Sequence, residues 1–127
     1  MKVIDASVML EVLHHSSAGD KLLAHFDDDL FAPDLLISEV LNRLRHDIRS
    51  GQLSEGRALE AVDALIEADI EFLPVWPYTK RIWELRHNVT SYDAAYVAMA
   101  EDLGCPLLTR DLRLARAPGL KTSVITG

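Results

Sequence analysis

Four carboxylates stand at positions where a charge needs a partner: Asp5, Glu39, Asp93 and Asp111. Asp5 falls within an N-terminal apolar run, and Asp111 follows a second such run by two residues. Carboxylates that converge repel one another and raise each other's pKa unless a cation compensates. Oxygen ligands without Cys or clustered His favour Mg²⁺ or Mn²⁺, the ions that typically assist phosphoryl transfer.

Asp93 is the acid that local structure explains least. In a helix predicted over 91–103, Tyr96, Met99 and Leu103 mark the apolar face at ~100° per residue. Asp93 falls within that face, about 40° from its centre by the same stepping. An unpaired charge there would cost several kcal/mol if buried. The alternative is a capping box, in which Thr90 and Asp93 satisfy the helix N-terminus while both remain solvated.

The other three acids also have ordinary explanations. Asp5 and Asp111 each precede a predicted helix, where Asp is a favoured N-cap. Glu39 lies at the border of an apolar helix stripe, where an i,i+4 pair with Arg43 would contribute only ~0.3–0.5 kcal/mol. Together, however, the four acids can meet only at one edge of a sheet, and this convergence favours a shared cation.

The elements that would position these acids alternate between strand and helix. Strands are predicted over 2–7, over 30–32 with Pro33 ending it, over 70–77 as a strand and its exit, and over 106–109 and 122–125. Helices are predicted over 8–14, 18–26, 34–50 with Asp34 as the N-cap, 54–69, 78–87, 91–103 and 111–116. This alternation predicts an α/β domain with a mainly parallel sheet of about five strands and helices on both faces. Ligands of such sheets bind beyond the carboxyl ends of the strands, where Asp5 and Asp111 are expected.

Composition is that of one ordinary globular domain, expected to span residues 1–127. The only cysteine, Cys105, excludes an internal disulfide, and no Cys/His cluster indicates zinc. Without a signal-peptide pattern or an apolar run of ~20 residues, a cytoplasmic location is expected. The net charge of -7 argues against nucleic-acid binding, yet it is uneven: 6 basic and 15 acidic residues precede residue 80, and 7 basic and 5 acidic follow.

Four segments resemble the PIN-domain ribonucleases, and specifically the VapC toxins of bacterial and archaeal toxin–antitoxin pairs. They are Val3-Ile4-Asp5-Ala6-Ser7, Ile37-Ser38-Glu39-Val40, the run from Ser91 to Ala100, and Leu107-Leu108-Thr109-Arg110-Asp111. The similarity covers nearly the whole chain. Each segment is weak alone, but their order and the chain length make the combination specific.

The resemblance implies a Mg²⁺-dependent endoribonuclease toxin of a type II system, with Mn²⁺ as a substitute ion. Asp5, Glu39, Asp93 and Asp111 would be the catalytic, metal-binding acids, and activated water would hydrolyse RNA phosphodiester bonds. Ser7 and Thr109 match the hydroxyl positions that orient these acids. Family members are usually homodimers inhibited by a cognate VapB antitoxin. Some carry a further acid after the last one, where this chain has Leu112 and Arg113.

Expectations for the remaining residues are more modest. Arg110, beside Asp111, is the first candidate for a substrate contact, and Arg43 is a second. The large aromatic residues are expected in the core or in a dimer contact rather than as base-stacking platforms: Trp76, Tyr78, Trp83 and Tyr96.

Two alternative functions use the same sequence features. A catalytically silent PIN-like scaffold would keep the acids for folding alone. A receiver-like phosphoacceptor also places acids at strand ends, but it needs an acidic pair by the first strand, an Asp after the third and a Lys after the fifth. The chain offers only Asp5 by the first strand and ends almost at the fifth.

Overall fold

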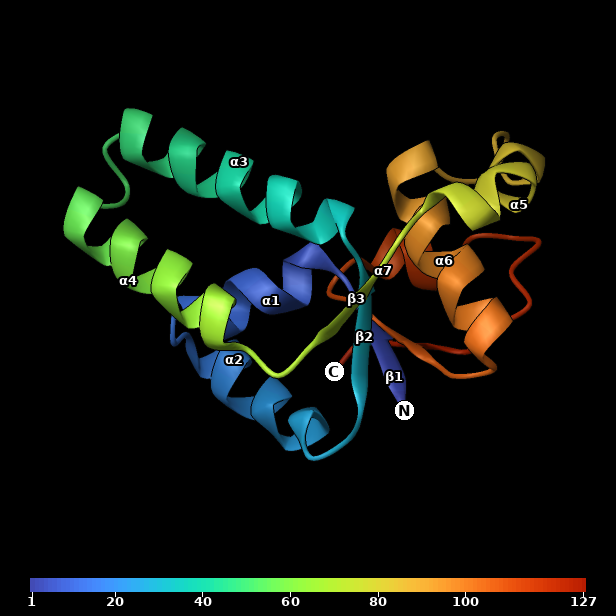
Figure 1. The fold of residues 1–127 in the computed structure, drawn as a ribbon, viewed down its shortest axis with the longest axis horizontal. Helices are drawn as coiled ribbons and strands as arrows, with labels where there is room; N and C mark the ends of the chain where they lie inside the picture. Colours follow the sequence, from blue (N-terminus) through green and yellow to red (C-terminus); the bar gives the residue numbers. More distant parts are fainter.

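Five short parallel strands form the centre of the computed structural model, which describes residues 1–127 (Figure 1). The strand order is β3-β2-β1-β4-β5, so the first strand lies in the middle. In register, Val3 pairs with Phe31 on one side and with Leu107 on the other. The strands are β1 (Lys2–Ile4), β2 (Leu30–Pro33), β3 (Glu71–Leu73), β4 (Leu107–Leu108) and β5 (Val124–Ile125).

Helices cover both faces of the sheet, as the sequence predicts. Figure 1 shows α1 to α4 on one side of the strands and α5 and α6 on the other. The helices are α1 (Ala6–Leu13), α2 (Ser17–Leu22), α3 (Leu35–Arg49), α4 (Glu55–Glu67), α5 (Thr79–Glu84), α6 (Ser91–Leu103) and α7 (Leu112–Ala115), with 3-10 turns η1 (Leu23–Phe26) and η2 (Trp76–Tyr78). None of them combines the length and apolar character needed to cross a bilayer.

Helix α6 is the buried helix of the fold. Every residue from Ala94 to Ala100 is buried, and the helix contacts β1, β2 and β4. Four of these seven residues are alanines, whose small side chains allow a helix to approach a sheet closely. The predicted bounds 91–103 agree with the structure. Asp93 lies in the first turn of this buried helix, close enough to Asp111 and Asp5 for their charges to raise its pKa.

Three local predictions need correction. The first strand ends at Ile4 and α1 begins at Ala6, because Asp5 already acts as the N-cap and accepts a hydrogen bond from the Val8 N–H at 3.1 Å. Pro33 belongs to β2 rather than ending it, since its missing N–H falls at the last strand position. Asp34 has helical torsions and makes no capping hydrogen bond, so α3 begins without a side-chain cap.

Of the two expected locations for the tryptophans, the core is excluded, and a dimer contact stays a prediction. Trp76 and Trp83 are 77% and 66% exposed, whereas Tyr96 is fully buried in the core. Trp83 instead carries the Arg86 guanidinium 4.5 Å above its ring.

Gly104 ends α6 in the left-handed conformation, with φ at 65°. A Cβ at this position would meet no atom within 4 Å, so the conformation alone requires glycine. Gly104→Ala is expected to lower the free energy of unfolding in urea by about 1 kcal/mol. Gly56→Ala, in α4 with the same open space and ordinary torsions, should instead raise it by a few tenths. Equal effects of the two substitutions would contradict this explanation of the α6 terminus.

Candidate metal centre

The Asp5 carboxylate is buried between the ends of β1 and β4, and both of its oxygens accept hydrogen bonds. Its Oδ1 accepts from the Ser7 hydroxyl at 2.5 Å and from the Val8 N–H, and its Oδ2 accepts from the Thr109 hydroxyl. Burial raises the pKa of Asp5, and the two hydroxyl donors oppose that rise. Ser7 and Thr109 therefore fix the carboxylate orientation and favour its charged form.

Glu39 has a different partner from the one expected. The predicted pair with Arg43 does not form, because Arg43 Nε lies 3.1 Å from Asp47 Oδ1 instead. Glu39 Oε1 accepts a 2.5 Å hydrogen bond from the Tyr96 hydroxyl on α6. This bond joins helices on opposite faces of the sheet and aims Glu39 toward the sheet edge.

Tyr96 is the residue of the site that the sequence analysis missed. A buried tyrosine needs a partner for its hydroxyl, and Tyr96 lies three residues after Asp93 on the same helix. A tyrosine at this spacing, on the helix face that carries an acid, was the sequence signal for its role in the site. Burial and the Glu39 charge raise the pKa of the Tyr96 phenol far above its usual value. The hydroxyl therefore stays protonated and donates to Glu39.

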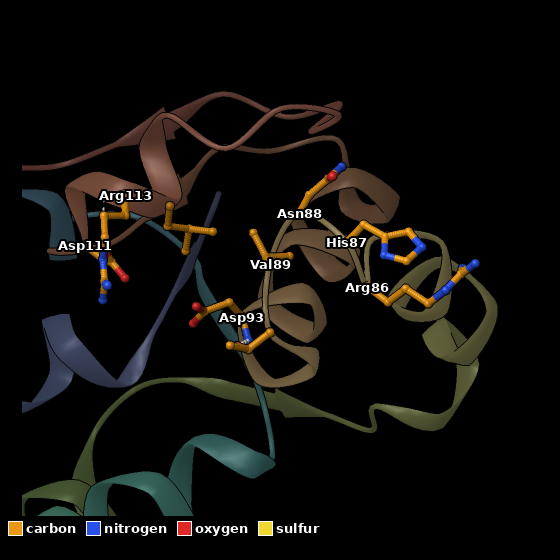
Figure 2. Close-up of a pocket in the computed structure, with 9 residues that line it drawn as sticks. Arg86, His87, Asn88, Val89, Asp93, Asp111 and Arg113 are labelled. Carbon is orange, nitrogen blue, oxygen red and sulfur yellow. Dashed lines mark hydrogen bonds and ion pairs between the residues drawn. The ribbon is translucent and has the colours of Figure 1, made fainter.

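Asp93 and Asp111 face each other from α6 and from the start of α7. Figure 2 shows the Asp93 carboxylate pointing toward Asp111. Burial raises the pKa of Asp93, and the charges of Asp111 and Asp5 raise it further. The Asp93 N–H donates to the Thr90 hydroxyl at 3.2 Å, so the predicted cap is present together with the acid cluster. Asp111 likewise caps α7, accepting from the Arg113 N–H at 2.9 Å.

A polar cavity of about 460 Å³ opens beside this pair. Asp93, Asp111 and Arg113 line it, together with the segment from Arg86 to Thr90. In Figure 2 the Arg86 and His87 side chains point away from the two acids. Next to the acids, the cavity therefore combines two carboxylates with Arg113, whose Nε lies 3.7 Å from Asp111 Oδ1.

The donor set fits a hard divalent cation. Burial raises the pKa of Glu39, and the charges of Asp93 and Asp5 raise it further, so the protein supplies too little positive charge for the cluster. Arg113 lowers the pKa of Asp93, but its side chain is 95% exposed. No three Asp, Glu, His or Cys side chains are close enough to surround one ion. Mg²⁺ commonly uses one or two carboxylates and completes its shell with water and phosphate oxygens.

The two candidate substrate residues lie together on the α1 side of the cluster. Arg110 and Arg43 line a second cavity that also includes Ser7. The Arg110 backbone N–H donates to the Ser7 hydroxyl at 3.0 Å, and that hydroxyl donates to Asp5. Ser7 therefore links the Arg110 backbone to the Asp5 carboxylate.

Comparison with known proteins identifies the same family along nearly the whole chain. The family model described as PIN domain matches residues 2–120. Ribonuclease VapC1 of Mycobacterium tuberculosis is 41% identical over 125 residues, covering 96% of this chain and 94% of that protein.

Two solved structures share the fold. PAE2754 from Pyrobaculum aerophilum is 25% identical with a TM-score of 0.72, covering 98% of this chain and 83% of that one. VapBC2 from Rickettsia felis, solved with a DNA fragment from the promoter, has a chain that is 12% identical with a TM-score of 0.67, and 97% of each chain is covered. At 12% identity, the second likeness concerns the fold alone.

Glu39→Gln is expected to stabilise the protein in the absence of divalent ions. The folded-state pKa of Glu39 is raised, so the folded protein binds this proton more tightly than the unfolded chain. The wild type therefore loses stability as pH rises above the unfolded pKa and through the folded one. In EDTA we expect the variant to melt about 2–5 °C higher at pH 7 and no difference near pH 3.

Glu60→Gln, an exposed position on α4, provides the matched control and should leave the melting temperature unchanged at both pH values. Equal melting of the wild type and Glu39→Gln at pH 7 would contradict the charge repulsion inferred for the acid cluster.

Proposed function

The chain belongs to the PIN domain family, and we propose that it is an endoribonuclease toxin of a type II toxin–antitoxin system. The observation that carries this proposal is the arrangement of Asp5, Glu39, Asp93 and Asp111 at one sheet edge, where burial raises the pKa of the first three and neighbouring acids raise it further for Glu39 and Asp93. Such a cluster favours a divalent cation. The curated relatives named as VapC ribonucleases support RNA as the substrate.

In this proposal Asp5, Glu39, Asp93 and Asp111 attract and ligate Mg²⁺, one or two of them binding the ion directly while water and phosphate oxygens complete its shell, and Mn²⁺ can substitute. When bound, the ion would activate water and offset charge on the phosphate that is cleaved. The protein's own side chains orient the acids. Ser7 and Thr109 orient Asp5, while Tyr96 orients Glu39. Asp93 lies at the mouth of the polar cavity, where a phosphate can approach it.

The partners follow from the relatives. A cognate VapB-type antitoxin is proposed as the inhibitor, and the name VapBC2 of the Rickettsia felis neighbour supports such a pairing. We also propose that residues 1–127 form one PIN domain, that the toxin acts in the cytoplasm, and that it works as a homodimer. The family match argues against the receiver-like alternative. A catalytically silent scaffold remains the alternative, and a cleavage assay distinguishes it from a ribonuclease.

Asp93→Asn is expected to reduce cleavage of single-stranded RNA at least 100-fold in Mg²⁺ or Mn²⁺. The substitution keeps the shape of the side chain but removes the charge that faces Asp111. Cleavage by the wild type should also stop in EDTA and return with added divalent ion. The measurement is the initial rate on a labelled RNA.

Asp63→Asn is the control, because Asp63 is exposed on α4 away from the cluster and makes no hydrogen bond. It should cleave at the wild-type rate. Full wild-type activity in EDTA would exclude the proposed metal dependence. A wild type that neither cleaves RNA nor is stabilised by Mn²⁺ would favour the scaffold.

Tyr96→Phe tests the hydrogen bond that orients Glu39. The ring still fills the core, but Glu39 loses its donor, so we expect a rate about 10- to 100-fold lower with the fold retained. Tyr92→Phe, on the same helix and 67% exposed, should have the wild-type rate. Circular dichroism and thermal melting verify folding. Equal rates for the two variants would show that Glu39 does not depend on Tyr96.

A further inference from the structure

The cavity beside Ser7 is larger than the one between Asp93 and Asp111, with a volume of about 500 Å³. It lies between α1, α3 and the start of α4, on the side of the sheet that Figure 1 shows covered by these helices. Ser7, Leu10, Glu11 and His14 line one side of it at i, i+3, i+4 and i+7 spacing. This face of α1 spans about 10 Å, so the cavity extends away from the acids as a groove.

Three arginines from different elements line this groove: Arg43 on α3, Arg57 on α4 and Arg110 after β4. The Arg57 and Arg110 guanidinium groups make no hydrogen bond or ion pair within the protein, and Arg43 uses only Nε, toward Asp47. Two carboxylates line the groove as well, but Asp47 pairs with Arg43 and Glu11 accepts a hydrogen bond from the Ser16 hydroxyl, so Arg57 and Arg110 remain available to attract phosphate. Arginine also binds phosphate oxygens in a two-pronged geometry that lysine lacks.

The arginines occupy different distances from the acid cluster. Arg110 lies at the near end, since its N–H donates to the Ser7 hydroxyl, which in turn donates to Asp5. Arg57 lies at the far end, because it lines a neighbouring cavity together with His14 and Leu53. A chain of phosphates that starts at the acids would therefore meet Arg110 first and Arg57 last.

The groove also offers contacts for a base. Asp47 is 6% exposed and lines the groove, as do the Gln52 amide and two leucines, Leu10 and Leu53. A carboxylate and an amide can hydrogen-bond a base edge, while the leucines contact its ring. Proteins that select RNA sequences commonly bind bases that are unpaired and turned out of a stack.

We propose that this groove is the subsite for the unpaired nucleotides next to the scissile bond, with Arg110 near the reacting phosphate and Arg57 on a phosphate farther along. The inference rests on the proposed ribonuclease function and specifies it. The substrate is single-stranded RNA that continues past the acids along α1. Asp47 and Gln52 then contribute to the choice of base at the flanking position.

The test combines Arg57→Gln with substrates shortened one nucleotide at a time from either end. For the wild type, shortening from one end raises KM once the RNA no longer reaches Arg57. Arg57→Gln should raise KM about fivefold on the full-length RNA and keep kcat within twofold. The KM of this variant should no longer change when the RNA is shortened from that end. The slope of log KM against log salt should fall by about one.

Arg45→Gln is the matched control, since Arg45 is exposed on α3 and does not line the groove. Its KM, kcat and length dependence should equal those of the wild type. If Arg57→Gln also equals the wild type in KM and length dependence, the subsite is excluded, and an acidic protein segment becomes the better occupant of the groove.

A binding measurement separates this inference from the proposed function. Fluorescence anisotropy of the full-length RNA is compared for Asp93→Asn and for Asp93→Asn/Arg57→Gln in Mg²⁺. If the wild type fails to cleave RNA, the nuclease proposal is wrong, yet about fivefold weaker binding by the double variant would still support the subsite. Equal binding by the two proteins, or no binding by either, would overturn the subsite.

Discussion

Repulsion among four carboxylates at one sheet edge is the constraint on which the functional surface depends. Asp5, Glu39 and Asp93 all have raised pKa values, caused first by burial and, for Glu39 and Asp93, also by neighbouring acids. Hydroxyl donors oppose this rise at Asp5 and Glu39, and Arg113, whose Nε lies 3.7 Å from Asp111 Oδ1, is 95% exposed and compensates the cluster only weakly. A buried cation would neutralise the cluster permanently, whereas hydroxyl groups orient the carboxylates and leave the charge available for a metal ion.

The fold brings this cluster together from distant parts of the chain. Asp5 and Thr109 meet because β1 and β4 are neighbours in the sheet, although 104 residues separate them in sequence. Glu39 and Tyr96 meet because α3 and α6 cover opposite faces and both reach the same edge. The acidic net charge therefore coexists with a proposed RNA site, since part of the charge serves the metal and the arginines of the groove lie beside it.

Sequence patterns predicted the fold class, the strand positions and the bounds of α6, because buried strands and an apolar helix leave strong local signals. They also indicated the four acids, whose positions beyond strands and on an apolar face are unusual. The resemblance also pointed to Ser7 and Thr109, which do bond Asp5, but the partner of Glu39 was beyond prediction. Whether Glu39 pairs with Arg43 or with Tyr96 depends on packing across the sheet, and the residues next to Glu39 in the sequence do not reveal it. The same limit explains why the sequence could not separate a core position from a dimer contact for Trp76 and Trp83, which are exposed in the single chain.

Paramagnetic broadening by Mn²⁺ in ¹H–¹⁵N NMR spectra tests the central claim most directly, because it locates the ion without requiring activity. At substoichiometric Mn²⁺, the account predicts that amide signals next to Asp5, Glu39, Asp93 and Asp111 broaden first and that the effect saturates. Added Mg²⁺ should reverse it. Broadening centred instead on the exposed acidic run from Asp27 to Asp29, or no saturable broadening, would contradict a metal centre at this sheet edge.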